Sequence, residues 1–217
     1  MQSVGLYDVG QEQQIRVAGP EGGRKKPFSA ILASAVTLAS GDILVTGGVG
    51  REREVYLLAG SDLTSWTLKT PMTYPRSSHA SARIVIGREE KVLAAGGWDS
   101  SGEVQATVEI YTRTKDVWET MPSLPTPRVD FALKVKKNTI SQFQLAQIVD
   151  SVVTVLGGYY GPDAARVFPK LAVISWSKNQ WGVWQQSEGQ EKRGQQRSGF
   201  MSTEVPLGWI KKLCGIK

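Results

Sequence analysis

Three Gly-Gly doublets recur along this chain of 217 residues, and each closes a short apolar run. The runs are five or six residues long and rich in β-branched side chains, which predicts a strand before each doublet. Successive doublets are 49 and 61 residues apart, and self-similarity at such a period indicates repeated structural units rather than one irregular domain. The doublets are Gly47-Gly48, Gly96-Gly97 and Gly157-Gly158, and the predicted strands cover residues 42–46, 91–95 and 151–156.

Aromatic and basic residues follow the first two doublets in the same order. Each doublet is followed by a tyrosine, a tryptophan, an arginine and one further ring. In both units the arginine comes ten residues after the tryptophan, and the last ring comes thirteen residues after it. The two sets are Tyr56, Trp66, Arg76 and His79, and Tyr111, Trp118, Arg128 and Phe131.

The third unit follows the pattern more loosely, with Val173-Ile174 in the tyrosine place, Trp181 next and Arg197 sixteen residues later. Near the N-terminus, Ile15 precedes Lys25 by ten residues and Phe28 by thirteen. We therefore expect the chain to open partway through an earlier unit.

This pattern resembles the kelch repeat, which folds as one four-stranded blade of a β-propeller. The likeness runs from about Leu6 to Phe200. It implies an all-β fold, a kelch-type β-propeller with about three complete four-stranded blades and a partial blade at each end. The expected units are 1–28 (strands c and d of a partial blade), 29–77, 78–129, 130–196 with insertions, and 197–217 (a partial blade and tail).

Within each unit, strand b runs into the doublet, strand c carries the tyrosine, strand d carries the tryptophan, and strand a is expected at 29–38, 78–86 and 130–136. A blade cannot bury both of its faces alone, so it stacks on its neighbours. Glycines permit close packing of backbone, and tryptophans offer large apolar faces for the same contact. We assign a structural role to the doublets and to Tyr56, Tyr111, Trp66, Trp118 and Trp181.

The number of units leaves two alternatives open. Either the chain is a piece of a longer propeller, which we favour, or its two ends combine into a fourth, imperfect blade. An unclosed ring exposes a sheet edge and an apolar flank, so we expect self-association through open blade edges.

Composition limits the kinds of partner. The net charge of +6 comes from scattered short groups of basic residues without a nucleic-acid-reading motif, so we expect no nucleic acid partner. The single cysteine, Cys214, fits a reducing compartment, and no apolar stretch is long enough to span a membrane. We expect a cytoplasmic protein that needs no cofactor and no metal.

Two insertions distinguish the third unit from the second. They fall at about 138–147, where we expect a long loop between strands a and b, and at 185–196, a polar segment rich in Gln, Glu and Gly. Tolerated divergence explains both better than a binding role does.

The resemblance places partner contacts on loops after the doublets and between strand d and the next strand a. Arginine and aromatic residues, the types enriched at binding hot spots, gather in these loops. The expected partner is a protein or peptide, of acidic character if the arginines make the contact. The candidate residues are Arg51, Arg53, Arg76, Trp98, Asp99, Arg128, Tyr159, Tyr160 and Arg166.

Each candidate has a plainer structural alternative. Arg76 and Arg128 recur in register, which suggests that they bond to carbonyl groups of a neighbouring blade. The structural alternative for Trp98, Tyr159 and Tyr160 is that their side chains cover the core beside the glycines. The alternative for Arg51 and Arg53 is a solvated turn. His79, the only histidine, is expected to pack in strand a.

We expect no catalytic residues. Some kelch-type propellers are enzymes, but a copper oxidase needs more histidine ligands than this chain has, and no carboxylate pair converges on the predicted face. The hypothesis is therefore a non-catalytic protein-binding module, which in a longer parent would be the substrate-recognition part of a ubiquitin-ligase adaptor. The alternative is a sugar or sialic acid epimerase-like enzyme.

Overall fold

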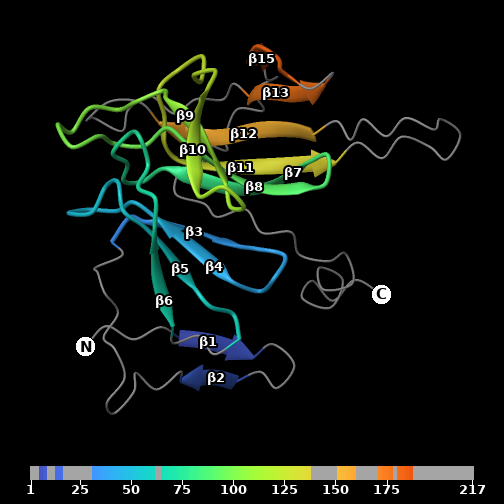
Figure 1. Ribbon diagram of the computed structural model, residues 1–217. Helices are drawn as coiled ribbons and strands as arrows, with labels where there is room; N and C mark the ends of the chain where they lie inside the picture. The colour runs from blue at the N-terminus through green and yellow to red at the C-terminus, as the bar shows by residue number, and fades with distance from the viewer. Residues whose placement is uncertain are drawn as a thin grey trace, which may run out of the picture.

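The computed structural model describes residues 5–8, 13–16, 31–61, 65–137, 151–159, 171–177 and 180–187. Throughout these residues the regular structure is β-strand, and every strand pair is antiparallel (Figure 1). The all-β prediction is therefore confirmed. The expected loop 138–147 and the tail 197–217 lie outside the described residues.

Three sheets follow one another along the chain, each built as a meander. The first sheet has the order β3-β4-β5-β6 and the second the order β10-β9-β8-β7, while the third runs β11-β12-β13 and ends in two short pieces, β14 and β15, that both pair with β13. A hairpin of β1 (Gly5–Asp8) and β2 (Gln13–Arg16) precedes them. The strands are β3 Ser34–Thr37, β4 Ile43–Thr46, β5 Val55–Leu58, β6 Trp66–Lys69, β7 Ala80–Ile86, β8 Glu89–Ala95, β9 Val108–Thr112, β10 Val117–Met121, β11 Val129–Lys137, β12 Ser151–Tyr159, β13 Leu171–Ser177, β14 Gln180–Trp181 and β15 Gln185–Ser187.

These sheets are kelch-type propeller blades. They lie within the units expected at 29–77, 78–129 and 130–196, except that β11 begins at Val129, the last residue of the expected second unit. The end points of the units remain predictions. Strand β15 corrects one detail, because residues 185–187 continue the third sheet instead of beginning an insertion.

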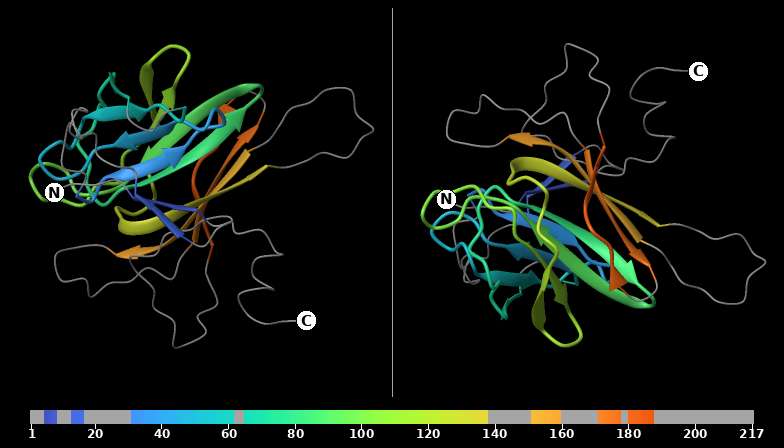
Figure 2. Two further views of the ribbon diagram at one scale, coloured as in Figure 1. Left: turned by 90° about the horizontal axis from the view of Figure 1, so that it is seen from below. Right: turned by 90° about the horizontal axis from the view of Figure 1, so that it is seen from above.

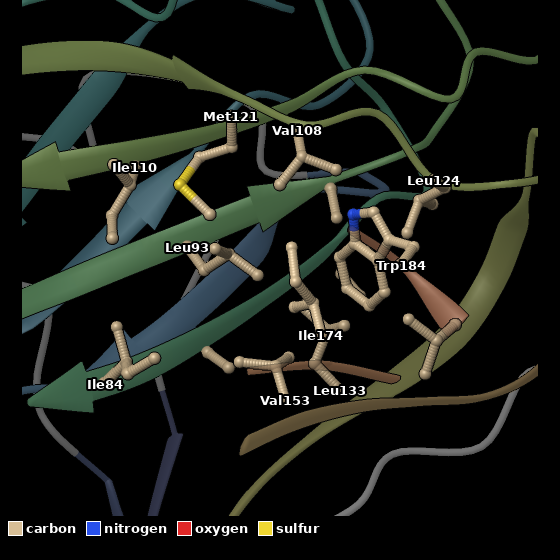
Figure 3. Packing of buried hydrophobic residues seen from close by; sticks show 14 of the residues in the cluster. Ile84, Leu93, Val108, Ile110, Met121, Leu124, Leu133, Val153, Ile174 and Trp184 are labelled. Carbon is tan, nitrogen blue, oxygen red and sulfur yellow. The ribbon is translucent and has the colours of Figure 1, made fainter. Parts of the chain in front are cut away.

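The sheets pack face to face, with β7 next to both β3 and β11 (Figures 1 and 2). The larger core lies between the second and third sheets and combines side chains such as Leu93 and Ile110 with Val153, Val155 and Ile174 (Figure 3). A smaller core lies between the first and second sheets. Apolar burial between sheets, at about 25 cal/mol per Å², is therefore the main stabilising contribution to the stack.

The doublets hold the sheets close to one another through the main chain. The amide of Gly48 donates to the carbonyl of Arg76 over 2.9 Å, and the amide of Gly97 donates to that of Arg128 over 2.8 Å. All four glycines of these two doublets have positive φ, and a Cβ on Gly47 or Gly96 would lie within 2.5 Å of that same arginine carbonyl oxygen, while one on Gly48 or Gly97 would lie within 2.8 Å of a backbone oxygen before strand a of its own sheet. Only glycine fits this approach.

Every sheet has a non-glycine residue in the left-handed region near the start of strand a, just before β3 and β7 and at the second residue of β11. These residues are Leu32, Ser78 and Asp130, with φ of 56°, 51° and 50°. The amide of Ser78 donates to the carbonyl of Leu32 over 2.9 Å, and the amide of Asp130 donates to that of Ser78 over 3.1 Å. A ladder of main-chain bonds thus links the three sheets at their inner corners.

The strand registers correct two positions in the repeat. Leu58 lies opposite Trp66, as Tyr111 lies opposite Trp118, so Leu58 and not Tyr56 is the counterpart of Tyr111. The residue before β3 is Ala33, and it occupies the place of His79 before β7, which the sequence pattern gave to Phe28.

Indole hydrogen bonds identify the tryptophan that ties each sheet to the one before. Trp118 Nε1 donates to the carbonyl of Thr70, just past β6, over 3.0 Å. In the third sheet, Trp184 Nε1 donates to the equivalent carbonyl of Pro122, just past β10, over 2.8 Å. Trp184 is buried in the larger core, whereas Trp181, the residue assigned from the sequence, is only partly buried beside it. Trp184 is therefore the counterpart of Trp118.

We predict that Trp184→Ala lowers the free energy of unfolding by about 3–5 kcal/mol, because it opens a cavity in the larger core and orphans the Pro122 carbonyl. Val183→Ala is the control, since this neighbour is 83% exposed and its change should alter stability by less than about 0.5 kcal/mol. Urea denaturation followed by tryptophan fluorescence measures both. Equal effects would contradict the anchoring role of Trp184.

Candidate partner-binding face

Two kinds of loop meet at the end of the sheets that bears the doublets. Loops 49–54 and 98–107 follow the doublets, and loops 70–79 and 122–128 lead into the next sheet. Hydrogen bonds join them, from Met72 to the carbonyl of Arg53 over 2.9 Å and from Leu124 to that of Ala106 over 2.8 Å. We call this surface the loop face.

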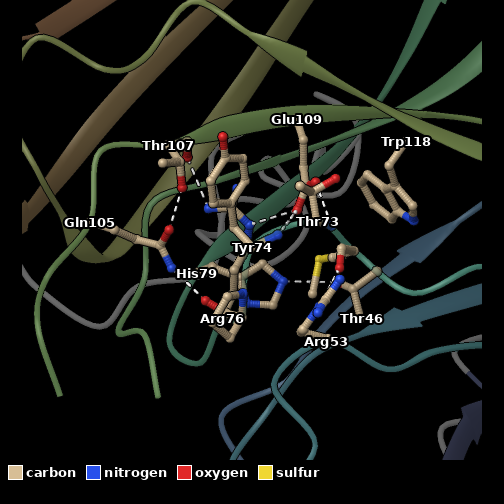
Figure 4. Close-up of polar contacts among 12 residues, drawn as sticks. Thr46, Arg53, Thr73, Tyr74, Arg76, His79, Gln105, Thr107, Glu109 and Trp118 are labelled. Atoms are coloured by element: carbon tan, nitrogen blue, oxygen red, sulfur yellow. Dashed lines mark hydrogen bonds and ion pairs between the residues drawn. The ribbon is translucent and has the colours of Figure 1, made fainter. Parts of the chain in front are cut away.

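Arg76 lies beneath the loop face with a fully buried side chain (Figure 4). Its Nη1 donates to the carbonyls of Gly96, over 2.8 Å, and Thr107, over 2.9 Å, and its Nε lies 3.3 Å from Oε1 of Glu109. Its own main chain bonds to the first sheet, through Glu52 and Gly48. Arg76 therefore joins the first sheet to the second and, in this conformation, does not reach a partner.

Glu109 is the buried counter-charge of Arg76. Besides the guanidinium, its carboxylate accepts the amides of Thr73 over 2.9 Å and of Tyr74 over 3.4 Å, while the Tyr74 ring lies 5.7 Å from Arg76 Cζ. Burial lowers the pKa of Arg76, and the attraction of Glu109 opposes that shift. The sequence pattern missed Glu109, because a single acidic residue in a strand gives no signal of its partner.

Arg128 occupies the same place between the second and third sheets, and its side chain is also fully buried. Its amide donates to the carbonyl of Gln105 over 3.3 Å, as the Arg76 amide donates to Glu52 over 2.7 Å. The register puts Ala172 of β13 where Glu109 stands in β9. The structure thus favours the structural alternative for both arginines.

Arg51 and Arg53 are the exposed arginines of the first loop. Nη1 of Arg51 lies 2.7 Å from Oε1 of Glu54, and the pair is partly open to solvent. Nε of Arg53 donates to the carbonyl of Met72 over 2.8 Å. Each arginine therefore has an intramolecular bond that a partner would share or displace.

Trp98 and Asp99 begin the loop of the second sheet. The main chain of Trp98 bonds to Ser77 in both directions, over 2.8 and 3.0 Å, and the Trp98 side chain is half-buried. Oδ1 of Asp99 accepts the hydroxyl of Ser101 over 2.7 Å and the amides of Ser101 and Glu103 over 2.9 Å, and the hydroxyl bond is the main cause of its lowered pKa. This loop is preorganised by its own hydrogen bonds.

Three exposed apolar side chains near the loop face were not among the candidates from the sequence. Ile31 is 62% exposed, Leu32 51% and Val49 49%, and the Val49 amide donates to the carbonyl of Ile31 over 2.9 Å. Val49, Trp98 and Tyr159 each come directly after a doublet, which could have marked the position as a shared apolar one.

The remaining aromatic candidates are only partly described. Tyr159 ends β12 opposite Val129, whereas Tyr160 and Arg166 lie outside the described residues.

His79 lies below the loop face, between the first and second sheets. Its Nε2 is 2.8 Å from the Thr46 hydroxyl, which is itself 3.2 Å from the Ser81 hydroxyl. Burial, helped by the nearby charge of Arg76, lowers the pKa of His79 to about 3. The ring is therefore neutral at pH 7, where it bonds the sheets together.

Within the described ranges, no group of three or more His, Cys, Asp or Glu side chains could hold a metal ion. The same part of the chain contains no helix long and apolar enough to cross a membrane.

Comparison with known proteins agrees with this architecture. Residues 88–125 match the family model of the kelch motif. The chain is also 35% identical to alpha-scruin of Limulus polyphemus over 68 residues, which is 31% of this chain and 7% of that protein. The resemblance to kelch-repeat proteins is confirmed, with the kelch motif itself matched at residues 88–125.

Kelch-like protein 38 is a second relative of this chain. Identity is 29% over 143 residues to the Homo sapiens protein and 27% over 141 residues to the Mus musculus protein. Each match covers 63% of this chain and 24% of the relative. The chain therefore spans about a quarter of the length of these relatives.

We predict that Arg76→Ala lowers the free energy of unfolding by about 3–5 kcal/mol, because it leaves the Glu109 carboxylate buried without its counter-charge. Arg51→Ala is the matched control, and its exposed ion pair should contribute little. Chemical denaturation gives both values. A small effect of Arg76→Ala would show that the buried pair does not hold the first two sheets together.

We also predict a pH dependence that comes from His79. The pKa of His79 is lower in the folded chain than in the unfolded chain. The stability that the neutral ring contributes is therefore fully present above about pH 6.5 and is lost as the pH falls toward 3. His79→Phe, which copies Phe131 of the third sheet, should flatten the dependence between pH 7 and 5.5, where most carboxylates stay ionised. Stability measured against pH for both proteins tests this, and parallel curves would refute it.

Proposed function

We propose that this kelch-repeat chain is a non-catalytic module that binds a protein or peptide through its loop face, with Trp98 at the centre of the contact. One observation carries the proposal: Trp98 keeps part of its side chain exposed on a loop whose main chain is fixed on both sides, by Ser77 and by Val104. A large ring on a rigid loop loses little conformational entropy on binding, and tryptophan is enriched at hot spots.

The exposed side chains around the loop face indicate a mixed partner surface. Ile31, Leu32 and Val49 favour apolar groups on the partner. Arg51 and Arg53 are the exposed cations of the first loop, so an acidic group would meet these two and not the buried Arg76 and Arg128. This refines the acidic partner expected from the sequence.

The relatives support a binding role at the level of the family. For the finer role, we propose that the chain serves a longer parent in the cytoplasm as the substrate-recognition part of a ubiquitin-ligase adaptor. The abundance of a captured partner should then rise when the parent is depleted from cells.

We also propose that the chain alone self-associates through open sheet edges. Sedimentation velocity tests this, and a single monomeric species at all concentrations would refute it.

We predict that Trp98→Ala reduces the capture of cellular protein partners about tenfold while circular dichroism stays unchanged, because the change removes a hot-spot ring and leaves the main-chain bonds of the loop. Leu68→Ala on β6 is the control, since Leu68 is 63% exposed and belongs to a strand instead of one of the loops that form the loop face. Quantitative mass spectrometry of proteins retained on the immobilised chains provides the measurement. Equal retention by all three proteins would move the binding surface elsewhere.

A further inference from the structure

The second sheet shows how this fold receives an arginine side chain. The guanidinium of Arg76 lies against the carbonyls of Gly96 and Thr107 and the carboxylate of Glu109 (Figure 4). Two of these acceptors are main-chain groups at fixed positions of the repeat, beside the doublet and just before strand c. The same acceptors therefore exist wherever the repeat keeps its register.

The first sheet keeps that register. Thr46 pairs with Val55, as Ala95 pairs with Val108 in the second sheet. The amide of Gly47 donates to the carbonyl of Glu54 over 2.8 Å, as the amide of Gly96 donates to that of Thr107 over 3.0 Å. The carbonyls of Gly47 and Glu54 are thus the counterparts of the two that bind Arg76, and Tyr56 stands in the place of Glu109.

The chain supplies no arginine from the equivalent position. Arg76 comes three residues before His79, and since Ala33 takes the place of His79, the counterpart of Arg76 is Ala30, whose methyl group carries no donor. Gly47 is buried, yet among the described residues its carbonyl accepts no hydrogen bond. Buried carbonyls are nearly always paired, so this one calls for a donor.

Negative charge lies next to these carbonyls. Oε1 of Glu54 bonds Arg51 and Oε2 accepts the Tyr56 hydroxyl, both over 2.7 Å. The side chains of Arg51 and Glu54 are 44% and 32% exposed, and an ion pair so open to water is readily exchanged. Two carbonyls and a carboxylate match the several donors of a planar guanidinium better than a single ammonium.

We propose that this end of the first sheet, on the face turned away from the second sheet, binds an arginine side chain of a partner protein. Glu54 supplies the counter-charge, and the carbonyls of Gly47 and Glu54 supply the fixed acceptors. The site goes beyond the binding role proposed above, because it needs neither Trp98 nor its loop.

The test is a fluorescent peptide with the sequence Thr-Tyr-Pro-Arg-Ser, which copies residues 73–77, added to the full chain and followed by anisotropy. We expect the peptide to bind, and a peptide with neutral citrulline in place of arginine to bind about tenfold more weakly. Glu54→Gln should weaken binding of the arginine peptide to a similar degree. Arg51→Ala should tighten it, since the carboxylate loses its present cation.

Matched controls separate this site from general charge attraction. Glu103→Gln removes an exposed carboxylate from another loop, and Arg83→Ala removes an arginine whose exposure of 44% equals that of Arg51 and which also pairs with a glutamate. Neither should change the affinity. If circular dichroism shows that Glu54→Gln does not fold, the comparison of Arg51→Ala, which should tighten binding, with Arg83→Ala, which should leave it unchanged, decides the question.

Three outcomes would overturn the proposal. The first is equal binding of the arginine and citrulline peptides, and the second is equal tightening by Arg51→Ala and Arg83→Ala. The third is that the wild type does not bind the peptide but a variant with glutamine in place of Arg24, Lys25 and Lys26 does. That result would show that a basic side chain of this chain already occupies the acceptors.

Discussion

The architecture depends on the close approach of the second glycine of each doublet to the strand a segment beside it. Gly48 and Gly97 donate their amides to the carbonyls of Arg76 and Arg128, and a Cβ at either glycine would collide with backbone. The hydrogen bond from each glycine amide fixes the main chain of the arginine that accepts it. For Arg76, the guanidinium is then placed against the next sheet, at Gly96, Thr107 and Glu109. The first doublet therefore positions the arginine that clamps the second sheet, and the second doublet holds the main chain of Arg128 in the same way.

The same positions carry different chemistry at the two junctions between sheets. Thr46, His79 and Ser81 form a polar cluster between the first and second sheets, while the corresponding Ala95, Phe131 and Leu133 between the second and third are apolar. Buried polar groups stabilise only when they are fully paired, whereas apolar contacts gain with area. Apolar contacts at the second junction should therefore contribute most of the stability, and the polar groups of the first should mainly fix how its sheets align.

The sequence predicted the sheets well and the roles of single residues less well. Apolar runs and doublets locate strands because both follow from local geometry. Tyr56 was misplaced in the repeat because residue spacing does not reveal strand register when the loops differ in length, and Trp184 was missed because strand d of the third sheet is split into β14 and β15. Arg76 and Arg128 were candidates for partner contact because they lie in loops, and bonding to a neighbouring blade was the open alternative. Their burial depends on the neighbouring sheet, which no local pattern shows.

Leu32, Ser78 and Asp130 show how this repeat can change its surface without changing its fold. A non-glycine residue in the left-handed region costs about 1–3 kcal/mol and persists only where its surroundings hold it. Here the bonds from Ser78 to Leu32 and from Asp130 to Ser78 involve main-chain atoms alone, so they do not depend on the side chain. An apolar, a hydroxyl and an acidic residue occupy the same conformation. At this inner corner, recognition can therefore vary from sheet to sheet while the hydrogen-bond ladder stays the same.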